Sequence, residues 1–454
     1  MNYKYFLIPA MLFVLTVSSC KKDTDTVFSE PAAQRVEKTL TALNTVLPEP
    51  NYWVANIFTG ASTGNAYSFY FDFEGNNRVK MLSDINNTTA TVLNESSYST
   101  KWLQQPTLLF DTYNYIHWLV DPVPGTNGLS GQVAGIGLVS DFEFGLSAVT
   151  TDSLNMDPSK VTKLYTIGRY NGTPVTFRKV SADEANYWTS GGIKNLRTNV
   201  ISYLKSSSNL YTQLNGNNEK QQIQIDTVYK TLSFTWVQSD SLVTKNTSYV
   251  FSYNDMLLFK DTVNFNGKLI TAIQWNKSLN TLSTIVNGTA TPVYTSSVPV
   301  LPLNIIVGIS VKNINVPYAT SFPGWSSDFT SRRASAAAAM LAGTYRLTMG
   351  QMQFNFLSPS VVNINLDIYQ GSTKFLAQFA YTVSKSSAGA LKFTANHAGD
   401  NGNASLIVSN MAPILAQRID TDNFTLDYYN DPTRGVLGKF TSVEHPDFYF
   451  TGTF

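Results

Sequence analysis

Two pairs of carboxylates have a spacing that could support chemistry. Asp72/Glu74 and Asp141/Glu143 each follow the pattern Asp-x-Glu. Residues i and i+2 of a β-strand share one face, about 6–7 Å apart. That separation is close to the spacing of the acid and base carboxylates in glycoside hydrolysis, and carboxylate oxygens also bind calcium. Phe residues alternate with these acids, however, and this alternation favours the solvent-facing side of an ordinary strand.

The other motifs that resemble catalytic signatures lack the context they need. Gly60-Ala61-Ser62-Thr63-Gly64 matches the G-x-S-x-G of a nucleophile elbow, which requires a helix directly after it. A strand is expected there instead, so the motif predicts a hairpin loop. His117, His397 and His445 are far apart in the sequence, and none forms an H-E-x-x-H motif. We therefore name no catalytic residue, no metal site and no cofactor, and keep Asp72, Glu74, Asp141 and Glu143 as candidate ligand or metal carboxylates.

Cys20 is the only cysteine of the chain, which excludes a disulfide framework and a cysteine-based zinc site. It follows Lys4 and an apolar run over residues 6–17. A run of about a dozen residues is too short to span a bilayer but is typical of a signal peptide. The segment Val17-Ser18-Ser19-Cys20 resembles the bacterial lipoprotein lipobox. This resemblance implies cleavage after residue 19 and acylation of Cys20. Residues 21–28 are polar and lack periodicity, so we expect residues 20–28 to form a tether.

Composition restricts the class of protein further. Charged residues are 14% of the chain, aromatic residues are 13%, and the formal net charge is +1. No basic run exceeds two residues, whereas nucleic-acid binding normally needs a concentrated basic face. We expect no nucleic-acid partner. The neutral polar and aromatic composition is typical of β-sheets.

Periodicity predicts a mainly β (α+β) protein, with antiparallel sheets in two lobes and a few helices packed on them. Helical spacing of apolar residues predicts a first helix over Ser29–Leu47, and Ser181 with Glu184 predicts a capping box at the start of another. A third helix is expected from about Asp328 to Leu341. Strands are expected at Tyr52–Phe58, Ala66–Phe73, Arg78–Ile85, Thr107–Phe110, Tyr115–Val120, Gly137–Phe144, Val161–Ile167 and Pro174–Val180, with many more towards the end.

The polar stretch 206–222 is the best boundary between two domains. We expect an N-terminal α+β domain over residues 29–210 and a β-rich C-terminal domain over residues 220–454. Asn171-Gly172, Asn266-Gly267 and Asn287-Gly288 predict tight hairpin turns.

Several stretches together resemble the DUF4302 family, lipoproteins of Bacteroidetes with no assigned function. The stretches that carry the resemblance are FSEPAAQRVEKTL, PNYWVANIF, YFDFEGNNRVKML, LLFDTYNYIHWLVDP, SDFEFGL and the closing FTLDYYND and YFTGTF. The resemblance covers roughly residues 20–210 best. It transfers no catalytic residue. It implies an outer-membrane lipoprotein encoded near SusC/SusD-like uptake systems.

These observations lead to one functional hypothesis and two alternatives. We expect an acylated envelope lipoprotein, anchored in the outer membrane on its periplasmic or surface-exposed face. Its expected role is that of a non-catalytic accessory or ligand-binding component of a SusC/SusD-like nutrient-uptake system. Its expected partners are a TonB-dependent transporter complex and a glycan or peptide ligand. The alternatives are a carboxylate-dependent hydrolase and a structural envelope protein.

Overall fold

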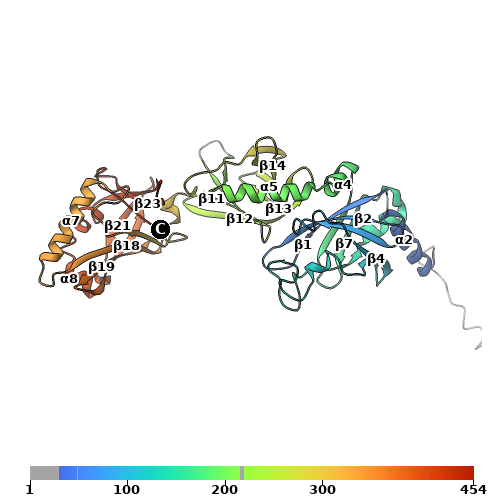
Figure 1. The fold of residues 1–454 in the computed structure, drawn as a ribbon, viewed down its shortest axis with the longest axis horizontal. Coiled ribbons are helices and arrows are strands. Elements are labelled where there is room, and N and C mark those ends of the chain that lie inside the picture. Colours follow the sequence, from blue (N-terminus) through green and yellow to red (C-terminus); the bar gives the residue numbers. More distant parts are fainter. Residues whose placement is uncertain (1–29, 49, 215–218) are drawn as a thin grey trace, which may run out of the picture. The chain divides into compact units, whose positions relative to one another are not determined.

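The structure is a computed structural model that describes residues 30–48, 50–214 and 219–454. The expected signal peptide, Cys20 and the expected tether lie outside these residues. Antiparallel strands dominate the described chain and a few helices accompany them (Figure 1), which confirms the predicted mainly β fold class. The strands form three successive sets of eight, and within each set every strand pairs with its neighbour in the sequence.

The first set is a closed barrel, in which β1 pairs with β8. Helix α2 (Ala32–Val46) precedes the barrel, and α3 (Ala148–Met156) lies between its sixth and seventh strands. Its strands are β1 (Tyr52–Phe58), β2 (Ala66–Phe73), β3 (Arg78–Ser83), β4 (Asn94–Trp102), β5 (Pro106–Phe110), β6 (Glu143–Leu146), β7 (Lys163–Gly168) and β8 (Pro174–Val180).

Aromatic rings fill the inside of this barrel. Phe69, Phe71 and Phe73 alternate along β2 and are fully buried, as the period of two in the sequence predicts. The ring of Phe71 lies 5.5 Å from that of Phe110 and 5.4 Å from that of Phe177, measured between centroids. The interior is therefore a packed core.

The second set follows α4 (Ala182–Thr189) and α5 (Gly192–Ser206). The Ser181 hydroxyl accepts a hydrogen bond from the Glu184 N–H at 3.2 Å, which is one half of the expected capping box. The Glu184 carboxylate instead accepts two hydrogen bonds from Arg178. The stretch 206–222, the expected domain boundary, runs from the last residue of α5 into the start of β10 and includes β9. The strands are β9 (Tyr211–Thr212), β10 (Gln221–Asp226), β11 (Thr231–Gln238), β12 (Ser241–Ser252), β13 (Met256–Phe265), β14 (Lys268–Asn276), β15 (Thr281–Val286) and β16 (Thr289–Pro292).

The third set follows the short helix α6 (Leu303–Ile306) and carries α7 (Ser327–Ala342), α8 (Gly402–Ile407) and the π-helical turn η5 (Leu415–Ile419) in its connections. Helix α7 confirms the expected third helix. The strands are β17 (Asn313–Val316), β18 (Thr348–Ser358), β19 (Val361–Gln370), β20 (Thr373–Lys385), β21 (Leu391–Ala395), β22 (Asn423–Asp431), β23 (Gly435–Ser442) and β24 (Tyr449–Gly452).

One residue pair joins the two ends of each of these later sets. We call these pairs the seams. In the second set Tyr211 and Tyr294 exchange backbone hydrogen bonds of 2.9 and 2.8 Å. In the third set Asn315 and Thr453 do the same at 2.7 and 2.9 Å. In the second set the Thr212 hydroxyl also donates to the Pro292 carbonyl at 3.2 Å. Both sets are therefore up-and-down meanders whose first and last strands are joined by few hydrogen bonds.

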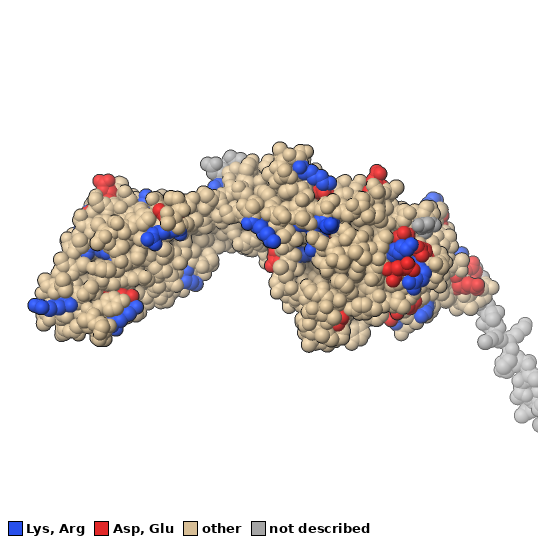
Figure 2. All heavy atoms as spheres, viewed as in Figure 1, with Lys and Arg blue, Asp and Glu red and all other residues tan. Residues whose placement is uncertain are grey.

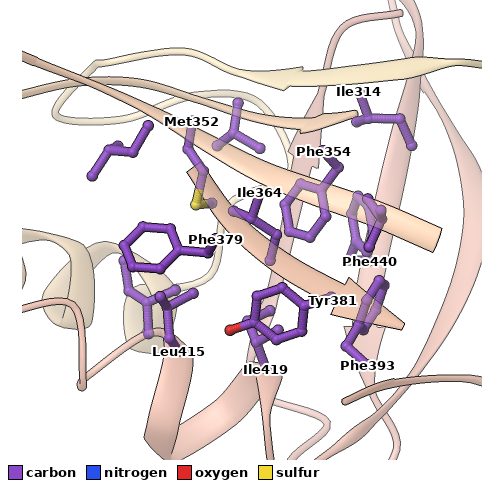
Figure 3. Packing of buried hydrophobic residues seen from close by; sticks show 14 of the residues in the cluster. Ile314, Met352, Phe354, Ile364, Phe379, Tyr381, Phe393, Leu415, Ile419 and Phe440 are labelled. Carbon is purple, nitrogen blue, oxygen red and sulfur yellow. The ribbon is translucent and has the colours of Figure 1, made fainter. Parts of the chain in front are cut away.

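The core of the third set is also aromatic. Figure 3 shows Phe354, Phe393 and Phe440 pointing inward from different strands, together with Leu415 and Ile419 of η5. The rings of Phe354 and Phe440 lie 4.5 Å apart between centroids. Burying such rings is the main source of stability available to a chain with few charged residues.

A buried ion pair lies in the second set. Lys230, in the turn between β10 and β11, and Asp84, which follows β3, are both buried. The Lys230 Nζ lies 2.6 Å from Asp84 Oδ1 and donates to the Asp84 carbonyl at 2.8 Å. The backbone N–H groups of Ser68 and Phe251 each donate to the Asp84 carboxylate at 2.8 Å, and Arg197 donates to its carbonyl. Burial lowers the pKa of Lys230 to about 7, although the Asp84 carboxylate opposes the shift.

The described chain divides into two compact units. One contains Phe69–Ser83, Val92–Asn186 and the described residues up to Gly60; the other contains Ala61–Ser68, Asp84–Thr91 and Tyr187–Phe454. No helix within the described residues is both long enough and apolar enough to cross a membrane. Figure 2 shows charged side chains scattered over the described part of the face in view, with acidic and basic groups intermixed.

Two of the expected strands are wrong. Tyr115–Val120 forms a turn and the 3-10 turn η2 (His117–Leu119), because the buried Asn114 side chain accepts a hydrogen bond from the Ile116 N–H and bends the chain. Most of Gly137–Phe144 is a loop, and strand β6 begins only at Glu143. Gly137 and Val139 have φ angles of 62° and 54°, which an extended strand does not allow.

Candidate functional site

A pocket of about 530 Å³ opens on the outside of the first barrel. We call it the loop pocket, because the loop before β6 and the turn between β7 and β8 build it. Its volume lies in the range of small-molecule sites, and its lining combines apolar and polar groups as such sites do. The lining residues are Val120, Pro122, Gly135, Ile136, Ser140, Asp141, Phe142, Glu143, Arg169, Tyr170 and Asn171.

Asp141 holds the turn that forms one wall of the pocket. Its Oδ1 accepts hydrogen bonds from the N–H groups of Tyr170 and Asn171, both at 2.8 Å, and its Oδ2 accepts one from Thr173 at 3.1 Å. A Cβ atom on Gly168 would lie 1.9 Å from Asp141 Oδ2, so only glycine fits beside this carboxylate. Asp141 is 2% exposed. The solvent-facing strand position favoured by the sequence is therefore wrong for Asp141, which is a structural anchor.

The anchored turn also explains a difference from the expected hairpin. A type I′ turn needs positive φ angles at both central residues. Gly172 has a φ of 71°, but Asn171 does not adopt a positive φ, because its N–H is directed to Asp141. At Asn266-Gly267 and Asn287-Gly288 both φ angles are positive, and these two turns are confirmed.

Glu143 and Arg169 are the charged side chains that face the loop pocket without an anchoring role. Arg169 Nε lies 3.7 Å from Glu143 Oε2, beyond hydrogen-bonding distance, and the side chains are 26% and 36% exposed. The guanidinium also donates to the Leu103 carbonyl through Nη1. The carboxylate and the guanidinium thus lie side by side at the pocket with capacity for further hydrogen bonds.

The other acid pair lies elsewhere. Asp72 lies on β2, and Glu74 is the first residue after this strand. Both side chains are half-buried, and neither lines the loop pocket. Glu74 Oε1 lies 2.5 Å from Lys80 Nζ, and this hydrogen bond raises the pKa of Lys80. Asp72 stands opposite Lys80 in the strand register. The four candidate carboxylates therefore do not form one constellation.

The loop that carries the pocket is conformationally strained. Val139 has a φ of 54°, a region that β-branched residues rarely adopt. Its carbonyl accepts a hydrogen bond of 2.9 Å from the Gly60 N–H, and a Cβ on Gly60 would lie 2.9 Å from Val139 Cγ1. The G-x-S-x-G motif is thus in a loop, as expected, and its first glycine allows this close approach. Such strain is concentrated at functional sites.

Ser140, next to this strained residue, is one of the lining residues of the pocket. The side chain is 1% exposed, and its hydroxyl has no hydrogen-bond partner among the described residues. A buried hydroxyl without a partner costs free energy, but this oxygen is closed to solvent, so a molecule in the pocket does not reach it in this conformation. The sequence identified neither Ser140 nor Arg169 as a site residue. The Asn-Gly signal located the turn beside Arg169 but did not show that Asp141 holds it.

Aromatic rings support one wall of the pocket from behind. The Phe142 ring lies 4.7 Å from the His117 ring, which in turn lies 5.6 Å from the Tyr113 ring. His117 is half-buried and lies on η2, and not on the strand expected over Tyr115–Val120. Burial lowers the pKa of His117, so the ring is neutral at pH 7.

The other two histidines each pair with an aspartate in the third set. The His397 Nδ1 lies 2.9 Å from Asp400 Oδ2, and the His445 Nδ1 lies 2.9 Å from Asp422 Oδ2. The Ser442 hydroxyl donates to the same Asp422 oxygen at 2.7 Å. Serine and histidine thus both bind the carboxylate, whereas a nucleophilic relay needs serine bound to histidine. Within the described ranges, no group of three or more His, Cys, Asp or Glu residues could hold a metal ion.

Comparison with known families shows which family the chain belongs to. The model of DUF4302, described as a domain of unknown function, matches residues 24–277. The chain belongs to the DUF4302 family. The matched region contains the whole first barrel and the second set as far as β14, so the loop pocket lies within the part that defines this DUF4302 protein as a family member.

Further comparisons add no function. No curated protein matches this DUF4302 protein. Among solved structures, the crystal structure of kievitone hydratase from Nectria haematococca is 9% identical over 90% of each chain, with a TM-score of 0.10. A score this low supports no structural argument.

Proposed function

We propose that this DUF4302 protein is a lipid-anchored outer-membrane protein of Bacteroidetes that binds a small ligand without transforming it. It serves as an accessory component of a SusC/SusD-like nutrient-uptake system. The observation that supports binding is the composition of the loop pocket. It has an apolar wall and one ion pair with spare hydrogen-bonding capacity.

The geometry favours binding over the alternative of a carboxylate-dependent hydrolase. Acid–base hydrolysis needs two carboxylates that can exchange protons at one reacting bond. Three N–H groups occupy the Asp141 carboxylate, which leaves Glu143 as the one pocket carboxylate free to act. Glu74, bound to Lys80, does not line the pocket.

A binding screen on the full mature chain tests the proposal. We expect saturable binding of a small ligand, measured by calorimetry, with no product detected by mass spectrometry. Arg169→Gln should weaken this binding, whereas Lys80→Gln, on β3 away from the pocket, should leave it unchanged. Turnover of a bound compound that is lost in Glu143→Gln would support the hydrolase instead.

Membrane attachment and partnership need separate experiments. Cys20→Ser should move the protein from the membrane fraction to the soluble fraction after cell lysis, because acyl chains supply the anchor. A Cys20→Ser protein that still incorporates radioactive palmitate would contradict the proposed anchor. Co-purification of a TonB-dependent transporter with the native protein from solubilised outer membranes would support the uptake role. Recovery of the protein without any transporter would instead favour a structural envelope protein.

A further inference from the structure

We propose that the loop pocket binds a neutral, polyhydroxylated ligand, a short stretch of an uncharged saccharide, in preference to an anionic compound or a peptide. This inference rests on the proposed binding function and adds the chemical class of the ligand. Three properties of the pocket support it: its charge balance, the arrangement of its hydrogen-bonding groups, and its apolar wall.

The charge balance disfavours charged ligands. Glu143 and Arg169 carry opposite charges, and only 3.7 Å separates Oε2 from Nε. The third charged lining residue, Asp141, is surrounded by three N–H dipoles that offset its charge. An anion attracted to Arg169 would be repelled by Glu143, and a cation attracted to Glu143 would be repelled by Arg169. A ligand without net charge avoids both costs.

The hydrogen-bonding groups match neighbouring hydroxyls. Glu143 offers an acceptor and Arg169 offers donors within a few ångströms of each other, while each sugar hydroxyl is both donor and acceptor. Two adjacent hydroxyls can therefore bind the two side chains at once.

The apolar wall suits the non-polar face of a sugar ring. Ile136 and Phe142 line the pocket, and Tyr170 at its edge is 89% exposed. A tyrosine ring supplies a rigid, amphipathic surface at low entropic cost on binding. A peptide would need unpaired backbone groups at a sheet edge or an extended groove, whereas a loop and a turn form this pocket.

Calorimetry on the full mature chain tests the proposal with defined probes. The panel contains neutral gluco-, xylo- and manno-oligosaccharides, uronic-acid oligosaccharides of equal length, and short peptides. We expect binding of at least one neutral oligosaccharide, with Tyr170→Ala and Arg169→Gln each weakening it about tenfold or more. Tyr165→Ala is the matched control, because Tyr165 is 44% exposed on β7 and does not line the pocket. Circular dichroism confirms that each variant is folded.

The outcomes separate this inference from the proposed function. Preferential binding of uronic-acid oligosaccharides or peptides, sensitive to the Arg169 variant, would overturn the ligand class but leave the binding function in place. Neutral-saccharide binding that neither variant affects would overturn the assignment of the ligand to this pocket. No binding by any probe, including a broad metabolite mixture, would overturn both proposals.

Discussion

Replacing Lys230 by methionine should destabilise the second set of strands by about 3 kcal/mol, near the lower end of the range for breaking a buried ion pair. The change removes a 2.6 Å ion pair and a 2.8 Å hydrogen bond, and leaves the Asp84 carboxylate buried. The loss of stability should stay near the lower end of that range, because the N–H groups of Ser68 and Phe251 still bind the Asp84 carboxylate.

Hydrogen exchange provides the appropriate measurement, because a chain with several sets of strands does not unfold in one step. The amides of Ser68 and Phe251 donate directly to Asp84, so their exchange rates report opening at this site. Lys277→Met is the matched control: Lys277 is 60% exposed and lies 2.8 Å from Asp255. An exposed pair of this kind contributes about 1 kcal/mol or less.

The same site predicts a dependence on pH. Because the pKa of Lys230 falls from 10.5 in the unfolded chain to about 7 in the fold, the unfolded chain binds more protons between these values. Stability should therefore rise with pH above about 7, and the rise should be smaller in Lys230→Met. Below pH 7 both states are protonated, and this contribution is constant.

Two results would refute this reasoning. One is a cost in Lys230→Met no larger than that of Lys277→Met. The other concerns the double variant. Lys230→Met combined with Asp84→Asn should cost less free energy of unfolding than the sum of the two single changes, because Asp84→Asn removes the charge left without a partner. A cost of the double variant equal to that sum would show that the two side chains are not coupled.

Two further predictions concern other carboxylates. Gly168→Ala should destabilise the first barrel by about 2 kcal/mol or more, because its Cβ would meet Asp141 Oδ2 at 1.9 Å. Gly75→Ala is the control and should change stability little, because no atom lies within 4 Å of its Cβ. Chemical denaturation compares the two variants, and equal effects would contradict the packing argument. Hydrogen bonds from Ser442, His445 and Thr421 outweigh burial and lower the pKa of Asp422. The stabilising contribution of the Asp422 carboxylate should therefore be lost as pH falls through that lowered pKa. Acid unfolding should begin at a higher pH in the wild type than in Asp422→Asn, after allowance for any difference in their stability at pH 7.

The strands were predictable where one local period decides the structure. Phe69, Phe71 and Phe73 alternate with polar residues, so β2 follows from its own sequence. The loop pocket was not predictable in this way. Asp141 binds N–H groups about 30 residues further along the chain, and no local pattern identifies such a partner. The same limit applies to Asp84 and Lys230, which lie 146 residues apart.

The seams determine how the second and third sets respond to force. β1 and β8 share four aligned residue pairs, whereas Tyr211/Tyr294 and Asn315/Thr453 are single pairs. Parting these pairs and the few hydrogen bonds beside them would leave an open sheet with two edges. An open edge presents unpaired N–H and C=O groups that accept another strand. Under tension each later set should yield first at its seam, and an extended segment from another chain could then be added there.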